Sequence, residues 1–253
     1  MSHKTNVFSP VGTPLLERTV GELVAERPGR SRVFQNFKID FCCQGARTLR
    51  EACEGKNVPV TSVVEQLEAE AADKTVPVEN PADLPTEQLA NYILDVHHGF
   101  LRRELPRLHA MSQRVAQVHG GHTPSLVEMN DVFQTVADEL ISHMAKEEEV
   151  LFPAVIALSK GEPAPRPLDA PIECMMHEHE EVGAGLERLR ELSHGFVPPP
   201  EACNTYRALF AGLHDLEEDM HRHIHLENAV LFPSAKALAE NPKSNKGKSS
   251  CCG

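Results

Sequence analysis

The sequence contains no tryptophan and only two tyrosines, and aromatic residues make up 5% of its 253 residues. Strands are enriched in aromatic and β-branched residues, whereas the Leu, Ala and Glu that are plentiful here favour helices. No uncharged apolar run reaches the ~18 residues of a membrane span, and residues 1–20 lack the basic start and apolar run of a signal peptide. We therefore expect a helical, cytoplasmic protein that does not enter a membrane.

Positive charge is also scarce. Lys and Arg number 25 against 37 Asp and Glu, so the formal net charge is −12 with His neutral. Nucleic-acid phosphates would be repelled by such a surface unless a basic patch were segregated, and none stands out. Nucleic acid is not an expected partner.

The seven cysteines do not form the pattern of a disulfide framework. Their number is odd, and four of them occur as adjacent pairs, Cys42-Cys43 and Cys251-Cys252. Such pairs suit thiol or metal chemistry in a reducing compartment better than structural disulfides. The remaining three are predicted to be packing residues: Cys53, Cys174 and Cys203.

The first pair, Cys42 and Cys43, lies just before a predicted helix start. Backbone N–H groups at such a position favour a thiolate, which could receive or deliver iron or exchange thiols. The alternative is a pair of half-buried cysteines that pack a turn. For the second pair no defined partner is expected, because it ends a polar, basic tail.

The chain divides into a small head, a larger body and a tail. Apolar residues recur at helical spacing over 15–38, "DFCCQGARTLREACEGKN" leads from a turn into a second helix, and "VTSVVEQLEAEAADK" fits a third. The proline-rich "TVPVENPADLP" is typical of a linker. We predict a helical N-terminal domain at 1–80, a second domain at 81–241 and a disordered tail at 242–253.

The second domain is predicted to contain four long helices. The breakers "HGGHTPS", "KGEPAPRPLDAP" and "HGFVPPPE" separate segments at about 86–118, 125–159, 171–194 and 201–240. Four antiparallel helices joined by short or moderate loops form an up-down-up-down bundle. The predicted fold class is all-α.

Two of these helices repeat one phrase. "HMAKEEEVLFP" begins at His143, and "HIHLENAVLFP" begins at His223. In each copy a glutamate follows the histidine by four residues, Glu147 and Glu227, so each pair shares one helix face, and apolar neighbours place that face inward. A single such pair is usually a satisfied polar pair, but two in register indicate a metal, which would compensate the buried carboxylates.

Each remaining helix offers a choice between two histidines. His98 shares a stripe with leucines and is preferred to His97, and His179 lies in line with apolar residues and is preferred to His177. The predicted ligands are His98, His143, Glu147, His179, His223 and Glu227. The other histidines are predicted to be solvated: His109, His119, His122, His194, His214, His221 and His225. Imidazoles with two carboxylates that can bridge suit two non-haem iron ions, or manganese.

Further residues of the repeat leave alternatives open. Pro153 and Pro233 each follow a predicted ligand by six residues, and would either bend their helices or end them. Glu139 precedes His143 by one turn and could accept a hydrogen bond from a ligand imidazole, or could help iron to leave. For Glu139 and for Glu178, a solvated helix face is the alternative.

These motifs resemble the repair of iron centres family, over about residues 12–238. The most specific are "IDFCCQG", "HMAKEEEVLFP", "MHEHEEVG", "PPPEACNTY" and "HIHLENAVLFP". The resemblance implies a hemerythrin-like bundle, the same six iron ligands, and a role in repairing iron-sulfur clusters damaged by nitric oxide or oxidants. Two features depart from the family pattern: "CCQG" replaces the common Cys-Cys-Gly-Gly, and the tail "SSCCG" has no counterpart.

Three functions are compatible with these residues. The first is repair, in which the protein supplies or mobilises iron for damaged iron-sulfur proteins. The second is binding or buffering of nitric oxide at the di-iron centre, and the third is enzymatic reduction of nitric oxide or activation of oxygen there. An oxygen carrier is less favoured, because that role does not need a cysteine domain. A homodimer is an open alternative to a single chain.

Overall fold

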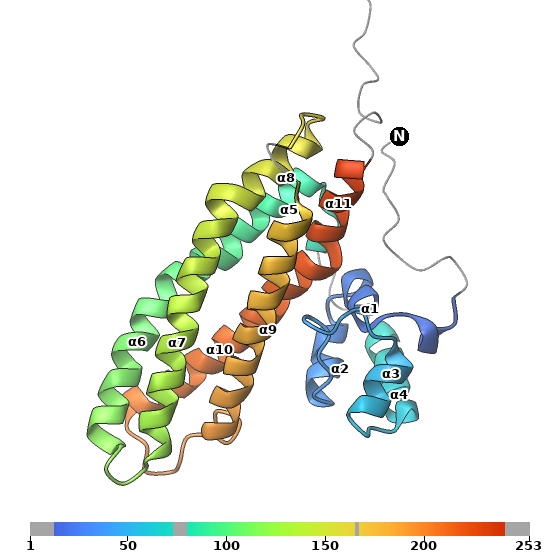
Figure 1. Ribbon diagram of the computed structural model, residues 1–253. Coiled ribbons are helices and arrows are strands. Elements are labelled where there is room, and N and C mark those ends of the chain that lie inside the picture. Colours follow the sequence, from blue (N-terminus) through green and yellow to red (C-terminus); the bar gives the residue numbers. More distant parts are fainter. Residues whose placement is uncertain (1–12, 73–79, 165–166, 241–253) are drawn as a thin grey trace, which may run out of the picture. The chain divides into compact units, whose positions relative to one another are not determined.

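The computed structural model describes residues 13–72, 80–164 and 167–240 (Figure 1). Within these ranges the regular secondary structure is helical, and the described strand-like pairing is one isolated bridge between Thr19 and Thr48. The all-α prediction is therefore confirmed. None of the described helices is long and apolar enough to cross a membrane. The predicted tail, with Cys251 and Cys252, lies outside the described residues.

The described residues form two compact units. The first contains the residues up to Ala90, those within Pro153–Asp169 and those from Ile224 onward, and the second contains Asn91–Phe152 and Ala170–His223. The predicted domain boundaries near residues 80 and 241 are not tested by this division and stay a prediction.

From residue 13 to residue 72, the described N-terminal part of the first unit contains five elements: η1 (Leu15–Glu17), α1 (Val20–Glu26), α2 (Arg30–Asn36), α3 (Leu49–Gly55) and α4 (Val60–Ala72). The expectation of a single helix over 15–38 was wrong. Pro28 and Gly29 separate α1 from α2, because proline lacks the N–H that would continue the first helix. Capping boxes start α1 at Thr19 and α3 at Thr48.

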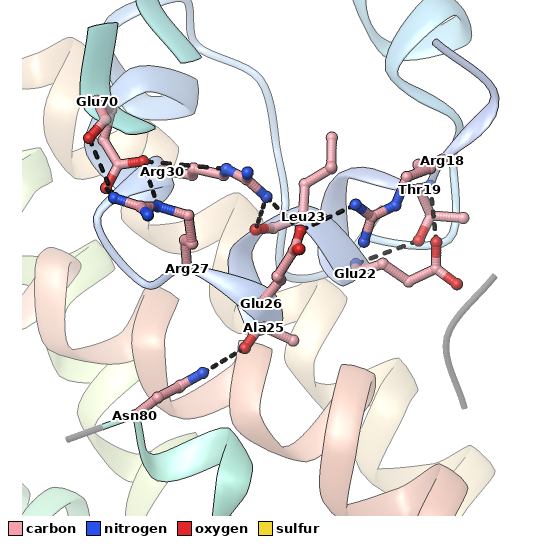
Figure 2. A network of polar contacts seen from close by, with 10 residues as sticks. All are labelled: Arg18, Thr19, Glu22, Leu23, Ala25, Glu26, Arg27, Arg30, Glu70 and Asn80. Carbon is pink, nitrogen blue, oxygen red and sulfur yellow. Dashed lines mark hydrogen bonds and ion pairs between the residues drawn. The ribbon is translucent and has the colours of Figure 1, made fainter. Parts of the chain in front are cut away.

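Arginine side chains join these short helices (Figure 2). The Arg27 guanidinium donates to Glu70 on α4, with Nε 3.0 Å from Oε2. Arg30 Nη1 donates to the Leu23 carbonyl at 3.0 Å and to Glu26 at 2.7 Å. Asn80 Nδ2 donates to the Ala25 carbonyl at 2.6 Å. These contacts fix α1, the start of α2 and the end of α4 as one support for the loop that carries Cys42 and Cys43.

Two glycines allow that loop to pack against α1. The Gly21 N–H donates to the Gly45 carbonyl at 2.9 Å. A Cβ at Gly45 would lie 2.6 Å from the Phe41 carbonyl oxygen, so a side chain does not fit there. Gln44, where the family commonly has glycine, is exposed and does not adopt a positive φ. The departure at "CCQG" is therefore compatible with this turn.

The remaining elements of the first unit are η2 (Pro81–Asp83), most of α5 (Thr86–Tyr92), most of α8 (Phe152–Ser159), η5 (Glu227–Leu231) and α11 (Phe232–Glu240). The cysteine loop contacts the helical run that contains η5. Asn228 Nδ2 donates to the Cys42 carbonyl at 3.2 Å, and the Phe41 ring meets the His225 ring edge to face, with centroids 5.6 Å apart.

The second unit is built on four helices, α6 (Gly99–His119), α7 (Ser125–Lys146), α9 (Asp169–Leu192) and the greater part of α10 (Asn204–Leu226) (Figure 1). Polar contacts join neighbouring helices. Ser112–Asn130 joins α6 to α7, Glu128–Arg188 joins α7 to α9, and Arg190–Glu217 joins α9 to α10. His97–Asp219 joins the segment before α6 to α10. Leu101, Phe133, Leu186 and Leu216 are fully buried among these helices. The predicted four-helix bundle is confirmed.

Among the residues that the structure describes, three π-helical segments interrupt the long helices: η3 (Ile93–His98), η4 (Glu147–Leu151) and η5. After η4 and η5 the Phe152 and Phe232 N–H groups bond five residues back, to the Glu147 and Glu227 carbonyls. The next residue in each case is a proline, Pro153 or Pro233, which cannot donate. The helices continue as α8 and α11, so the alternative that these prolines end the helices was wrong.

Candidate metal centre

The six predicted ligands are buried. His98, His143, Glu147, His179 and His223 belong to the second unit, come from four different helical runs and are at most 1% exposed. Glu227 follows His223 by one turn on the same helical run and is fully buried.

The ligand atoms form two groups, within each of which they lie within 4.8 Å of one another. We call the first the His143 position; it consists of His143, Glu147, His179 and Glu227. We call the second the His98 position; it consists of His98, Glu147, His223 and Glu227. Both glutamates belong to both groups, as expected of carboxylates that bridge two cations.

The surroundings of the Glu147 carboxylate show whether a cation fits between these side chains. Both carboxylate oxygens are buried, and neither accepts a hydrogen bond from a described residue. Instead, Oε2 lies 3.2 Å from His98 Nε2 and Oε1 lies 3.4 Å from His143 Nε2. The His143 and His179 Nε2 atoms are 3.1 Å apart. A buried carboxylate costs free energy unless a charge compensates it, so this set of donors fits bound cations.

Two further carboxylates orient the rings of predicted ligands. Glu178 accepts a hydrogen bond from His143 Nδ1 at 2.8 Å, and Glu148 accepts one from His98 Nδ1 at 2.7 Å. With the proton on Nδ1, the Nε2 lone pair of each ring faces the centre. Basic side chains neutralise both carboxylates: Lys146 pairs with Glu178, and Arg102 pairs with both oxygens of Glu148.

Burial alone would raise the pKa of Glu178. Hydrogen bonds from Lys146 and His143 outweigh burial and hold that pKa below its usual value. Glu139 does not bond to a ligand in any described contact; burial and the nearby Glu181 and Glu178 raise its pKa. Glu148 was not predicted, and the second copy of the repeat has Asn228 at the equivalent position.

We predict that Glu148→Gln weakens metal binding about 10–100-fold, because the amide no longer fixes the His98 ring as a carboxylate does. The measurement is competition against a chelator of known affinity. Glu149→Gln is the matched control, since Glu149 is exposed on the same segment. Equal affinities of the Glu148→Gln variant and the wild type would show that Glu148 does not orient His98.

His225 belongs to the set predicted to be solvated, and His97 was passed over in favour of His98 as a ligand; both are buried. His97 is 3% and His225 is 4% exposed. The prediction for His97 failed because it assumed the α-helical period, whereas His97 and His98 lie in the π-helical segment η3, where successive side chains turn less far around the axis. His225 packs against Phe41, and its burial, partly offset by a backbone hydrogen bond with Phe41, lowers its pKa to about 4. The other histidines in that set are exposed or half-buried, as is His177.

The cysteines also differ from the prediction. Cys42 does not favour a thiolate: contact with Cys43, burial and the Asp40 carboxylate raise its pKa well above its ordinary value. Asp40 Oδ1 accepts hydrogen bonds from the Cys42 N–H, the Cys43 N–H and the Cys42 thiol. These three residues nevertheless form a group whose ligand atoms lie within 4.8 Å of one another. Cys53 is buried as predicted, but Cys174 and Cys203 are exposed rather than packed.

Fold and centre together define a hemerythrin-type protein, a helical bundle whose inward His and Glu residues form groups that could hold metal ions. Family comparison agrees: residues 89–235 match the hemerythrin HHE cation binding domain, and residues 16–71 match a domain of unknown function, DUF542. The chain belongs to the repair of iron centres family, whose curated members carry the name iron-sulfur cluster repair protein.

Two relatives show how far the similarity extends. The iron-sulfur cluster repair protein YtfE of Pectobacterium carotovorum subsp. carotovorum (strain PC1) is 35% identical over 219 residues, which cover 87% of this chain and 96% of the relative. The iron-sulfur cluster repair protein ScdA of Staphylococcus haemolyticus (strain JCSC1435) is 35% identical over 216 residues, covering 85% and 96%. The predicted family is confirmed, and both the cysteine loop and the metal centre fall within matched regions.

Proposed function

We propose that this protein holds two non-haem iron ions and uses them in the cytoplasm to repair iron-sulfur clusters damaged by nitric oxide or oxidative stress. The observation that carries the proposal is the sharing of Glu147 and Glu227 between two four-residue ligand groups. The names of the relatives support the repair role.

The donor set supports iron. Each position offers two imidazole nitrogens and two carboxylate oxygens, with no thiolate. Structural zinc sites usually contain cysteine, whereas mixed histidine and carboxylate sets with open positions are typical of non-haem iron. Bound ferrous ions would supply one-electron chemistry and a labile source of iron. The protein residues would hold these ions, and Glu148 and Glu178 would orient the imidazoles.

The cysteine loop is the proposed point of exchange with damaged iron-sulfur proteins. Cys42, Cys43 and Asp40 together offer two sulfur atoms and one oxygen to a soft cation. Because the Cys42 thiol is held neutral, it would have to lose its proton when a metal binds. Binding of the metal would therefore activate the pair, and without a metal the thiol would stay unreactive.

Nitric oxide binding, buffering or reduction at the same centre is the second candidate. Each cation would have four protein ligands, of which two are shared, and iron commonly takes more than four. Coordination positions would thus remain for nitric oxide or oxygen. This candidate needs no cysteine loop.

One experiment distinguishes the two candidate functions. Anaerobically purified protein should contain two irons per chain, and the ferrous form should restore activity to a cluster enzyme damaged by nitric oxide, with iron leaving the repair protein in proportion. A stoichiometry near one, or full zinc occupancy, contradicts the di-iron centre. Nitrosyl or nitrous oxide formation with no recovered cluster would favour the second candidate.

A further inference from the structure

The two positions of the centre differ in their surroundings, although the sequence repeat places equivalent residues around them. A carboxylate precedes the repeated histidine by one turn in each copy: Glu139 before His143, and Asp219 before His223. Glu139 is exposed, whereas Asp219 is only 7% exposed. The two copies therefore present one carboxylate to solvent and bury the other.

At the His143 position the carboxylates line an opening. A surface pocket of about 320 Å³ is lined by Asp138, Glu139, Ser142, Lys146, Glu178 and Glu181. Glu178 belongs both to this pocket and to the hydrogen bond with His143 Nδ1. The pocket is thus separated from the predicted ligand His143 by one side chain, Glu178.

At the His98 position aromatic rings cover the ligands. His97 stacks on His223, with ring centroids 5.3 Å apart and an interplanar angle of 10°. Phe152 stacks on His98 at 5.7 Å and 25°. Tyr92 meets the His97 ring edge to face at 5.7 Å. The half-buried carboxylate on this side, Glu148, is held by Arg102 at both oxygens.

Asp219 fixes the ring of His97, which covers His223. Its Oδ1 accepts a hydrogen bond from His97 Nδ1 at 3.0 Å, joining the segment before α6 to α10. Neither Asp219 Oδ2 nor His97 Nε2 has a hydrogen-bond partner among the described residues. A buried pair with half of its polar atoms unsatisfied costs stability, which suggests that it has another use.

We propose that His97 and Asp219 close the His98 position, so that its ion exchanges slowly while the ion at the His143 position exchanges through the acidic pocket. His97 and Asp219 are positioning residues: they act by holding the His223 ring and excluding water from it. The inference rests on the proposed two-metal centre, and it divides that centre into a retained ion and an exchangeable one.

The test measures iron release. Protein loaded anaerobically with Fe²⁺ is first analysed for two ions per chain, then mixed with excess ferrozine while the coloured complex is followed. We expect two phases of equal amplitude in the wild type. His179→Ala should remove the fast phase and His223→Ala the slow phase, which assigns each phase to its position.

The closure itself is tested by His97→Ala and Asp219→Asn. Each should accelerate the slow phase about 10–100-fold and leave the fast phase unchanged. His177→Ala is the control, since His177 is exposed on α9 beside the ligand His179 and should alter neither phase. If His97→Ala does not fold, as judged by circular dichroism, Asp219→Asn still decides the matter because it preserves the size of the side chain.

The outcomes are distinct. Fewer than two bound ions in the wild type would contradict the proposed centre itself. Two bound ions released in one phase, or a slow phase unchanged in Asp219→Asn, would overturn the closure and leave the centre intact. Equal acceleration of both phases would assign the pair a general structural role and likewise overturn the inference.

Discussion

Glu147→Leu is expected to abolish binding at both metal positions, because one carboxylate contributes to both ligand groups. Replacing a histidine such as His179 removes a ligand from one position only. Metal analysis after anaerobic purification should therefore find close to no bound iron in Glu147→Leu, but residual iron in His179→Ala. Glu149→Leu, which alters an exposed residue two positions away, should retain the wild-type content.

The same variant should change stability in opposite directions with and without metal. In the metal-free protein the buried Glu147 carboxylate accepts no hydrogen bond from a described residue, so its replacement by an apolar side chain should raise the free energy of unfolding, by about 1–4 kcal/mol. With Fe²⁺ present, the wild type gains stability from bound ions and the variant does not.

Urea denaturation at pH 8 is the appropriate measurement, because ordinary imidazoles are neutral above about pH 6.5 and would not pair with the carboxylate. A metal-free Glu147→Leu protein that is less stable than the wild type would show that Glu147 is satisfied within the fold. It would then be a structural residue rather than a bridging ligand.

The sequence predicted which side chains the helices bring together inside the bundle. Stepping by three and four residues from His143 and from His223 placed both repeat pairs inside the bundle, and the structure gathers these residues with His98 and His179. Their role as ligands stays a prediction. Such stepping depends on a constant helical period. That period still holds from His143 to Glu147, where the Glu147 N–H bonds to the His143 carbonyl before η4 begins.

Prediction of burial from helical spacing failed where the helical period changes, and where contacts with other segments bury a side chain. The π-helical segment η3 allows both His97 and His98 to be buried, although neighbours in an α-helix usually face different environments. His225 is buried by Phe41, which lies far away in the sequence. Glu148 contacts His98 on another helix, and no spacing within one helix can predict that contact.

The prediction of a thiolate at Cys42 and Cys43, made from the local sequence, was also wrong for Cys42. Proximity to a helix start suggested a thiolate, but Asp40 precedes the pair by two residues and accepts hydrogen bonds at the place where an anionic sulfur would have to form. An adjacent carboxylate disfavours a second negative charge, and burial acts in the same direction. Reactivity at this site therefore depends on what binds there.

Replacing both Cys42 and Cys43 with serine should abolish cluster repair while leaving iron content and nitric oxide binding intact. All six proposed ligands lie outside the loop, so the loss of sulfur does not remove a donor from the centre. A serine hydroxyl is a poor ligand for a soft metal and does not ionise near neutral pH, so the loop could no longer take up iron. The measurement is the recovered activity of a nitric oxide-damaged cluster enzyme, with iron content and nitrosyl formation determined on the same sample.

The control is Cys203→Ser, which also removes a thiol, but an exposed one far from Asp40 in sequence. It should repair clusters at the wild-type rate. Asp40→Asn provides a graded test: without the carboxylate the Cys42 thiol should ionise more readily, so alkylation of Cys42 by iodoacetamide should accelerate. Unimpaired repair by the Cys42→Ser and Cys43→Ser protein would refute the exchange role, and nitric oxide capture at the metal centre would then be the better account of the protein.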